Sequence, residues 1–114
     1  MAEWTVLVSD SAVEDLRWIG RPDSRLVLTE AINRLSNDPL AESPNQKRLR
    51  PNPKASHELR LRGKYRVLYS ADESNFAVVI EVVGVKRNER LVVRGEEYSD
   101  HESDFPEGSA DKVE

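Results

Sequence analysis

Residues 57–69 hold the side chains of this 114-residue chain with the clearest potential for chemistry, because apolar and cationic residues alternate there. A β-strand directs successive side chains to opposite faces. We therefore expect one face built from leucine, valine and tyrosine, and a second face with a row of cations and no matching row of acids. Fixed cations on a rigid sheet suit a polyanion, which points to nucleic acid. The cations of this row are Arg60, Arg62, Lys64 and Arg66.

Composition narrows the chemistry that these residues can perform. The chain has no cysteine, which excludes disulfides and thiolate catalysis. Its two histidines, His57 and His101, lie far apart in sequence, so a zinc site is not expected, whereas magnesium held by carboxylates stays open. No apolar run approaches the ~20 residues of a membrane span, and the first four residues lack the features of a signal peptide. We expect a soluble, cytoplasmic protein that needs no cofactor.

The net charge of −4 conceals a strong segregation of charge along the chain. Residues 1–46 carry four basic and eight acidic side chains, residues 47–95 carry twelve and five, and residues 96–114 carry one and eight. A cationic block between acidic neighbours indicates a basic binding face. An acidic end of this kind is often solvated and disordered. We therefore expect a single domain over residues 1–95 and a disordered tail over residues 96–114.

The N-terminal third predicts a strand followed by two helices. Alternation over residues 4–8 indicates a short strand. Ser11 and Glu14 fit a capping box that would begin a helix, which the next glycine would end. A second helix with an apolar stripe would start near Pro22 and stop at residues 37–39. These two helices would form a hairpin that must lie on an apolar surface.

The rest of the chain predicts an antiparallel sheet. Residues 40–56 are rich in proline and cations without periodicity, which is typical of a loop. We expect one strand over residues 58–69, followed by a hairpin turn. A bend or bulge at the glycine at position 63 would shift which side chains face which side of the sheet beyond it. Residues 76–85 are apolar on both parities and predict a central strand, and residues 91–93 predict a short edge strand or a helical turn. The order indicates an α+β fold, with the N-terminal strand and helical hairpin packed on a small antiparallel sheet.

The combined pattern resembles the RelE/ParE toxin superfamily from about Trp4 to about Arg90. The elements expected above occur in the order typical of that fold. Three groups of residues carry the likeness most specifically, and their combination is more telling than any one of them. They are Lys47-Arg48-Leu49; Leu59-Arg60-Leu61 with Gly63 and Tyr65-Arg66-Val67-Leu68-Tyr69; and Val83-Gly84 followed by Lys86-Arg87.

The resemblance implies the toxin half of a bacterial type II toxin–antitoxin pair, with a cognate antitoxin as partner. Members similar to RelE cleave mRNA in the ribosomal decoding site and so inhibit translation. Members similar to ParE inhibit DNA gyrase and need no ribonuclease residues. A shared fold does not separate these activities, because function lives in the site. A RelE-like endoribonuclease is the first interpretation, a ParE-like gyrase inhibitor the second, and a toxin fold without catalysis the third.

Metal-free cleavage of RNA defines what such a site would need. The 2′-hydroxyl of the substrate attacks the phosphate, so the protein must accept a proton, stabilise a dianionic phosphorane and protonate the leaving oxygen. The resemblance implies that basic residues on two neighbouring strands supply the positive charge. Arg66 is the first candidate, as a phosphate clamp. Arg60, together with Lys86 or Arg87, matches the other basic positions.

Several residues compete for the proton-transfer role. Arginine has a pKa above ~12 and is a poor proton shuttle. His57 and Glu58, at the start of the strand, could titrate usefully if partly buried. The family pattern often places a tyrosine at about Val92 or Val93 of this chain. Tyr98 is the candidate substitute, and the alternative is that the role is empty. The expected RNA-binding cations are Lys47, Arg48, Arg50, Lys54, Arg62 and Lys64.

Each assignment has a purely structural alternative. The cationic face could be a solvated sheet face, and Arg66 could pair with an acid such as Glu81. The basic loop could hold an acidic antitoxin segment, a use compatible with RNA binding. His57 could instead be a structural residue at the edge of a strand. Both tryptophans could anchor the core or an interface. The acidic tail is either inert or folds back over the cations.

Overall fold

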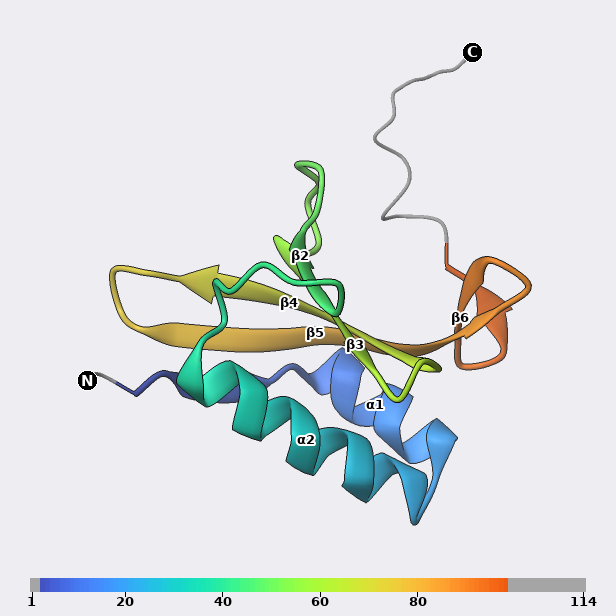
Figure 1. Ribbon diagram of the computed structural model, residues 1–114. Helices are drawn as coiled ribbons and strands as arrows, with labels where there is room; N and C mark the ends of the chain where they lie inside the picture. The colour runs from blue at the N-terminus through green and yellow to red at the C-terminus, as the bar shows by residue number, and fades with distance from the viewer. Residues whose placement is uncertain (1–2, 99–114) are drawn as a thin grey trace.

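The computed structural model describes residues 3–98 as a two-layer α+β fold, which confirms the predicted fold class. The two helices lie beneath one face of the sheet, and the loop between the second and third strands rises from the other side (Figure 1). Neither helix of the described part of the chain is long and apolar enough to cross a membrane. The elements are β1 (Thr5–Val8), α1 (Asp10–Ile19), α2 (Asp23–Asn37), β2 (Gln46–Arg48), β3 (His57–Leu61), β4 (Tyr65–Asp72), β5 (Ala77–Arg87), β6 (Arg90–Val93) and β7 (Glu96–Glu97).

Strand β5 is the centre of the sheet and borders three other strands. One of its edges pairs antiparallel with β4 along its length. Its other edge is divided between β1, which runs parallel to it, and β6, which runs antiparallel. The remaining strands extend the sheet in the order β2-β3-β4 on one side and β6-β7 on the other. Apolar residues of β5 are buried on both parities, as the sequence predicts for a central strand.

The single strand predicted over residues 58–69 is wrong, because the chain reverses within it. Strands β3 and β4 are separate and are joined by a tight turn in which Arg62 and Gly63 have φ values of 55° and 66°. This left-handed conformation is the one that tight hairpin turns need. The register that results pairs Arg60 with Arg66. Because directly opposite residues share a face of the sheet, these two arginines still lie together.

The two faces of the sheet carry separate apolar clusters. The main core lies against α1 and α2 and includes the buried strand residues Leu59, Val67 and Ile80. The opposite face is covered by neither of the two described helices, and we call it the open face. It carries a smaller cluster of buried residues, to which partly buried side chains of the β2–β3 loop and of β6 are added. The buried members of this cluster are Ala55, Leu68, Val82 and Leu91.

Helix α1 begins earlier than the sequence pattern suggests. Its N-cap is Ser9, whose Oγ accepts a hydrogen bond from the Ala12 N–H at 3.1 Å. The capping box predicted at Ser11 is therefore wrong, because a hydroxyl two residues upstream already satisfies the first turn. The helix ends as predicted at Gly20, whose N–H donates to the Leu16 carbonyl at 3.0 Å.

A buried carboxylate joins α1 to the middle of β5. Asp15 is 1% exposed, and its Oδ2 accepts a hydrogen bond from the Val83 N–H at 3.0 Å. Val83 lies between the segments of β5 that pair with β1 and with β6. The Oδ1 of Asp15 lies 2.9 Å from Arg94 Nε. Burial raises the pKa of Asp15, while the Val83 hydrogen bond and Arg94 oppose this effect. Asp15 thus closes the gap along the edge of β5.

The connecting segments differ from the predictions in detail. Residues 40–56, expected to form a loop, contain the short strand β2, which pairs antiparallel with β3. Isolated three-residue strands carry little periodicity, so β2 was not visible in the sequence pattern. Helix α2 stops before Pro39, as predicted, and the expected edge segment at residues 91–93 belongs to strand β6.

The acidic tail predicted over residues 96–114 begins with ordered backbone. Glu96 and Glu97 form β7 against β6, and the Tyr98 N–H donates to the Leu91 carbonyl at 2.8 Å. Residues 99–114 lie outside the described residues. The disorder expected there, and the domain boundary expected at residue 95, therefore stay predictions.

Candidate functional site

The open face brings two of the predicted cations onto one carboxylate. Arg60 of β3 and Arg66 of β4 lie directly opposite each other in the strand register. The Nε of each lies 3.3 Å from Oε2 of Glu58. Glu58 precedes Arg60 by two residues on β3, so strand alternation places both on the same face. Because two guanidiniums share one carboxylate, the group retains a net positive charge.

Arg66 is the more enclosed of the two arginines. Its side chain is 10% exposed, compared with 37% for Arg60. Its Nη1 donates to the Tyr65 carbonyl at 3.1 Å, whereas its buried Nε has no hydrogen-bond acceptor among the described residues. Burial lowers the pKa of Arg66, the Glu58 carboxylate raises it and Arg60 lowers it. The pairing considered with Glu81 is thus replaced by one with Glu58. A guanidinium has five N–H donors, so those that Glu58 and the Tyr65 carbonyl do not engage can bind a further anionic acceptor such as a phosphate oxygen.

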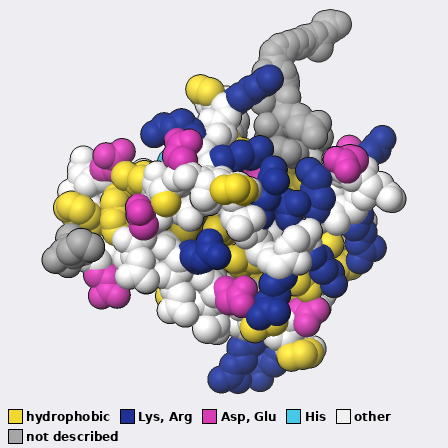
Figure 2. Space-filling model, in the orientation of Figure 1, with side chains coloured by type: hydrophobic (Ala, Val, Ile, Leu, Met, Phe, Trp, Pro, Cys, Tyr) yellow, Lys and Arg dark blue, Asp and Glu magenta, His cyan; other side chains and the backbone are white. Residues whose placement is uncertain are grey.

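The arginine pair is bordered by the open-face cluster. Tyr98 packs against this cluster and therefore lies on the same side of the sheet as Arg66. Gly84 lies opposite Arg66 in the β4–β5 register. A Cβ at Gly84 would come within 2.7 Å of the Val92 carbonyl oxygen. The absence of a side chain at this position therefore allows the backbone of β6 to approach β5 closely. Figure 2 shows Lys and Arg side chains gathered between the rising loop and the β6–β7 end of the molecule.

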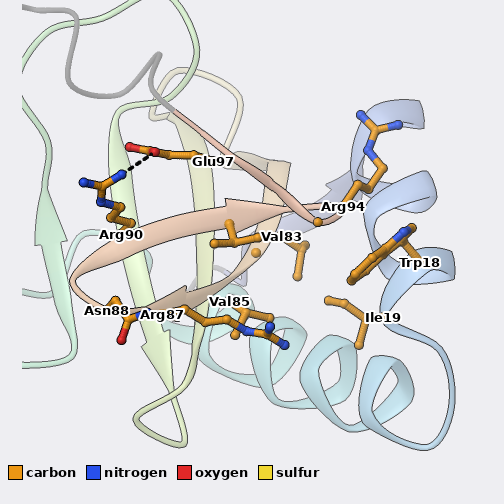
Figure 3. Close-up of a pocket in the computed structure, with 12 residues that line it drawn as sticks. Trp18, Ile19, Val83, Val85, Arg87, Asn88, Arg90, Arg94 and Glu97 are labelled. Carbon is orange, nitrogen blue, oxygen red and sulfur yellow. Dashed lines mark hydrogen bonds and ion pairs between the residues drawn. The ribbon is translucent and has the colours of Figure 1, made fainter.

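The structure separates the two cations predicted at the end of β5. Val85 packs in the main core, so strand alternation directs Arg87 to the same side and Lys86 to the open face. Arg87 instead lines a pocket of about 590 Å³ at the end of α1, together with Trp18 and Ile19 (Figure 3). Lys86 is therefore the candidate that shares the face of the arginine pair, and Arg87 is not.

The two tryptophans occupy different settings. Trp4 packs edge-on against Phe76, with ring centroids 5.2 Å apart, at the margin of the main core. Trp18 is 57% exposed and forms one wall of the pocket in Figure 3. The ion pair between Arg90 and Glu97, at 2.8 Å, stands at the rim of the same pocket. Trp4 thus fits the expected core anchor, whereas Trp18 is a surface residue in the described chain.

His57 does not join the arginine pair. It is 3% exposed and stacks on Tyr69, with ring centroids 5.3 Å apart, while its Nδ1 lies 2.7 Å from Ser56 Oγ. Burial lowers the pKa of His57, and Arg48 lowers it further. Strand alternation places His57 on the face opposite Glu58. Of the two bases suggested by the sequence, only Glu58 stands where it could accept a proton from a substrate on the open face.

Three of the predicted RNA-binding cations border the open face. Lys47 lies opposite Glu58 in the pairing of β2 with β3, so it shares the face of the arginine pair. Arg50 and Lys54 belong to the loop that rises beside this face. Asn52 braces that loop, because its Nδ2 donates to the Arg50 carbonyl at 2.8 Å and its Oδ1 accepts from the Lys54 N–H at 2.9 Å. The loop therefore presents its cations from a fixed backbone.

The other three predicted RNA-binding cations are directed elsewhere. Arg62 Nη2 lies 2.7 Å from Oε2 of Glu30 on α2. Lys64 Nζ lies over the ring of Tyr65, 5.2 Å from its centroid. Arg48 is on the opposite face of β2 from its neighbour at position 47. The hairpin turn is the reason for the first two departures, because residues 62–64 belong to no strand. The predicted row of four cations thus reduces to its two strand arginines.

This arrangement can perform phosphate chemistry in principle. Guanidiniums bind phosphate oxygens and remain charged across the physiological pH range. The Glu58 carboxylate can accept a proton, and Lys86 and Tyr98 bring an ammonium and a phenol to the same face. Within residues 3–98, no group of three or more histidine, aspartate or glutamate side chains is placed to hold a metal ion.

Gly84 is a positioning residue whose role the sequence analysis missed. The Val83-Gly84 motif contains it, but the sequence pattern does not reveal its contact with β6. A glycine inside an apolar strand marks a bulge or a close approach of another backbone, and that signal was present in the sequence. The identity of the Arg66 partner was hidden for a different reason: it depends on the register of a hairpin that was read as one strand.

Comparison with known proteins places this geometry in a family context. The structure is similar to a chain of the toxin–antitoxin complex RelBE2 from Mycobacterium tuberculosis, with a TM-score of 0.61 and 32% sequence identity. The match covers 71% of this chain and 95% of that one. No protein-family model matches the sequence, and neither does any curated protein. An identity of this size over nearly the whole of the other chain goes beyond a likeness of fold.

Proposed function

This chain belongs to the RelE/ParE superfamily as a RelE-like toxin of a toxin–antitoxin system, and on that premise we propose that it cleaves messenger RNA on the ribosome without a metal ion. The observation that carries the proposal is the pair Arg60 and Arg66 on the open face, held 3.3 Å from a single shared carboxylate. A structural ion pair would balance its charges, whereas this cluster has one guanidinium in excess. Such an excess suits a phosphodiester.

The proposed reaction uses the nucleophile that RNA carries itself. The scissile phosphate binds with its non-bridging oxygens toward Arg66 and Arg60, and Glu58 accepts the proton of the 2′-hydroxyl. The bond between the 2′-oxygen and phosphorus forms as the bond between phosphorus and the 5′-oxygen breaks. Lys86 or Tyr98 donates a proton to the leaving 5′-oxygen. The products are a 2′,3′-cyclic phosphate and a 5′-hydroxyl end, and the arginines stabilise the dianionic phosphorane between them.

A cognate antitoxin is the proposed protein partner. The similar chain was solved in a toxin–antitoxin complex, and an acidic segment of such a partner would complement the cations of the open face. Co-expression with the neighbouring reading frame and co-purification would identify it. A small acidic protein that relieves growth inhibition would support the pairing.

Mapping of transcript ends after induced expression tests the nuclease proposal. The wild type is expected to produce cuts phased with codons, and Arg66→Ala to lower cleavage by about 10²-fold or more, as loss of a transition-state donor does elsewhere. Arg62→Gln is the matched control, because Arg62 pairs with Glu30 on the helix side and its loss leaves the open face intact. Circular dichroism confirms that both variants fold. Cleavage that survives Arg66→Ala unchanged would contradict the proposed site.

A ParE-like inhibitor of DNA gyrase is the second candidate, and one observation favours it. The family pattern often carries a tyrosine at about Val92 or Val93, and Val93 packs against the open-face cluster. A non-enzymatic toxin would not need that phenol. Growth arrest with intact mRNA and a DNA-damage response would establish this function in place of the first.

A further inference from the structure

The described chain ends on the open face. Tyr98, its last residue, packs on the cluster that contains Leu68 and Val82, and its N–H donates to the Leu91 carbonyl. Leu68 and Arg66 are two residues apart on β4 and therefore share a face. The segment that follows Tyr98 thus starts on the same face of the sheet as the arginine pair, where RNA is proposed to bind.

The charge of that segment is opposite to the charge of the face where it starts. Residues 99–114 carry six carboxylates and one lysine. The open face presents the arginine pair, whose one carboxylate is shared, and further cations at positions 47, 54 and 86, against a further carboxylate, Glu81, which lies near Tyr98. Glu97, the last described acid before the segment, is already engaged with Arg90 at 2.8 Å. The arginine pair therefore has anion-binding capacity that a neighbouring acidic segment can fill.

We propose that residues 99–114 dock on the open face of their own chain and compete there with RNA for Arg60 and Arg66. The proposal rests on the RNA-binding function proposed above. Four of the six acids lie within nine residues of Tyr98, and an extended chain covers ~3.5 Å per residue, so they reach about 30 Å from that residue. A short tether gives an effective concentration on the order of millimolar, which makes individually weak ion pairs sufficient.

The consequence is a toxin whose RNA affinity depends on its own acidic segment. The docked segment must leave before a phosphodiester can reach the arginines. Arg60 is the more exposed of the two arginines, so salt weakens its contact with the segment once the Debye length falls to ~3 Å at about 1 M. We expect the segment to weaken RNA binding about tenfold at low ionic strength and to have little effect at high ionic strength.

A spin label tests the docking without any measurement of activity. The chain has no cysteine, so Ser109→Cys creates one attachment site for a nitroxide on the full-length protein. The label is expected to broaden the backbone amide signals of Arg60 and Arg66 more than those of α2 on the other face. Replacing the six acids by their amides, in the same labelled chain, is expected to remove this difference. Equal broadening of both faces, or broadening that persists in the amide form, would overturn the proposal.

A mixed sample separates docking within one chain from docking between two copies. Labelled chains without ¹⁵N are combined with unlabelled ¹⁵N chains, so that any broadening arises between molecules. The proposal expects none at Arg60 and Arg66, and strong broadening there would assign the face to a second copy instead.

RNA affinity then connects the docking to function. The probe is a fluorescent 12-nucleotide single-stranded RNA, titrated with the wild type and with the amide form at low and high salt. The amide form is expected to bind about tenfold more tightly at low salt, with the gap closing at high salt. Equal affinities at both salt levels would refute the competition. Docking seen by spin label, with no RNA binding by either form, would instead reject the RNA function proposed above and the competition that depends on it.

Discussion

The shared carboxylate of the arginine pair leads to a quantitative prediction. Glu58→Gln removes the negative charge while keeping the size and hydrogen-bonding capacity of the side chain. Arg66 then keeps a buried guanidinium with no counter-charge, since its side chain is 10% exposed. Removing one partner of a buried ion pair costs about 3–5 kcal/mol. The Arg60 half of the contact is more than a third exposed and adds only about 0.2–1 kcal/mol.

We therefore expect Glu58→Gln to lower the free energy of unfolding by about 3 kcal/mol, and the melting temperature by roughly 12–24 °C for a domain of this size. Urea unfolding followed by circular dichroism measures the change. Arg60→Gln is the control and should stay within about 1 kcal/mol, because it also relieves repulsion with Arg66. The double variant Glu58→Gln/Arg66→Gln should be more stable than Glu58→Gln alone. Should Glu58→Gln match the wild type, or the double variant be the least stable, Glu58 does not hold Arg66.

Three further predictions concern the packing around the site. The Tyr69 hydroxyl donates to the Pro39 carbonyl at 2.6 Å, so Tyr69→Phe should lower the free energy of unfolding by about 1–2 kcal/mol at neutral pH. Burial raises the pKa of Tyr69 to about 12, so the wild type should lose stability between pH 10 and 12 and the Tyr69→Phe variant should lose less. Urea unfolding at pH 7 and at pH 12 measures both effects. Gly84→Ala should cost about 2–3 kcal/mol, because its Cβ would meet the Val92 carbonyl at 2.7 Å; an unchanged melting temperature would contradict the close contact. Burial lowers the pKa of His57, so the unfolded chain takes up a proton first and stability should fall as pH drops below the ordinary value of 6.5; His57→Phe should flatten that acid limb in unfolding curves between pH 7.5 and 5.

The sequence predicted element types well where periodicity extends over many residues. Both helices, the central strand β5 and the N-terminal strand follow from apolar spacing. The hairpin between β3 and β4 was missed, because Arg62-Gly63-Lys64 interrupts an alternation that continues with the same parity on both sides. Because the alternation keeps the same parity across the turn, Arg60 and Arg66 lie on one face whether residues 58–69 form one strand or two. The sequence therefore places them together even though the strand assignment is wrong.

Features that depend on tertiary pairing were beyond sequence reasoning. The separation of Lys86 from Arg87 follows from alternation, but only once Val85 is known to face the helices. The burial of His57 against Tyr69 depends on the β3–β4 register. Asp15 lies on the apolar side of α1. An acid in such a position indicates a buried hydrogen-bonding or charged partner, but the sequence does not reveal which residue that partner is. Register and partner identity are therefore what the structure adds.

The division of one β5 edge between β1 and β6 constrains how this protein can be made. Thr5 pairs with Ala77, and the Asp15 carboxylate waits for the amide of Val83. A nascent chain therefore holds its first strand without a sheet partner until nearly the whole domain has left the exit tunnel. Contacts between such distant parts of a sequence form late. A fragment that stops before β5 therefore lacks both the strand that pairs with β1 and the Val83 amide that Asp15 binds, so it cannot complete this edge of the sheet.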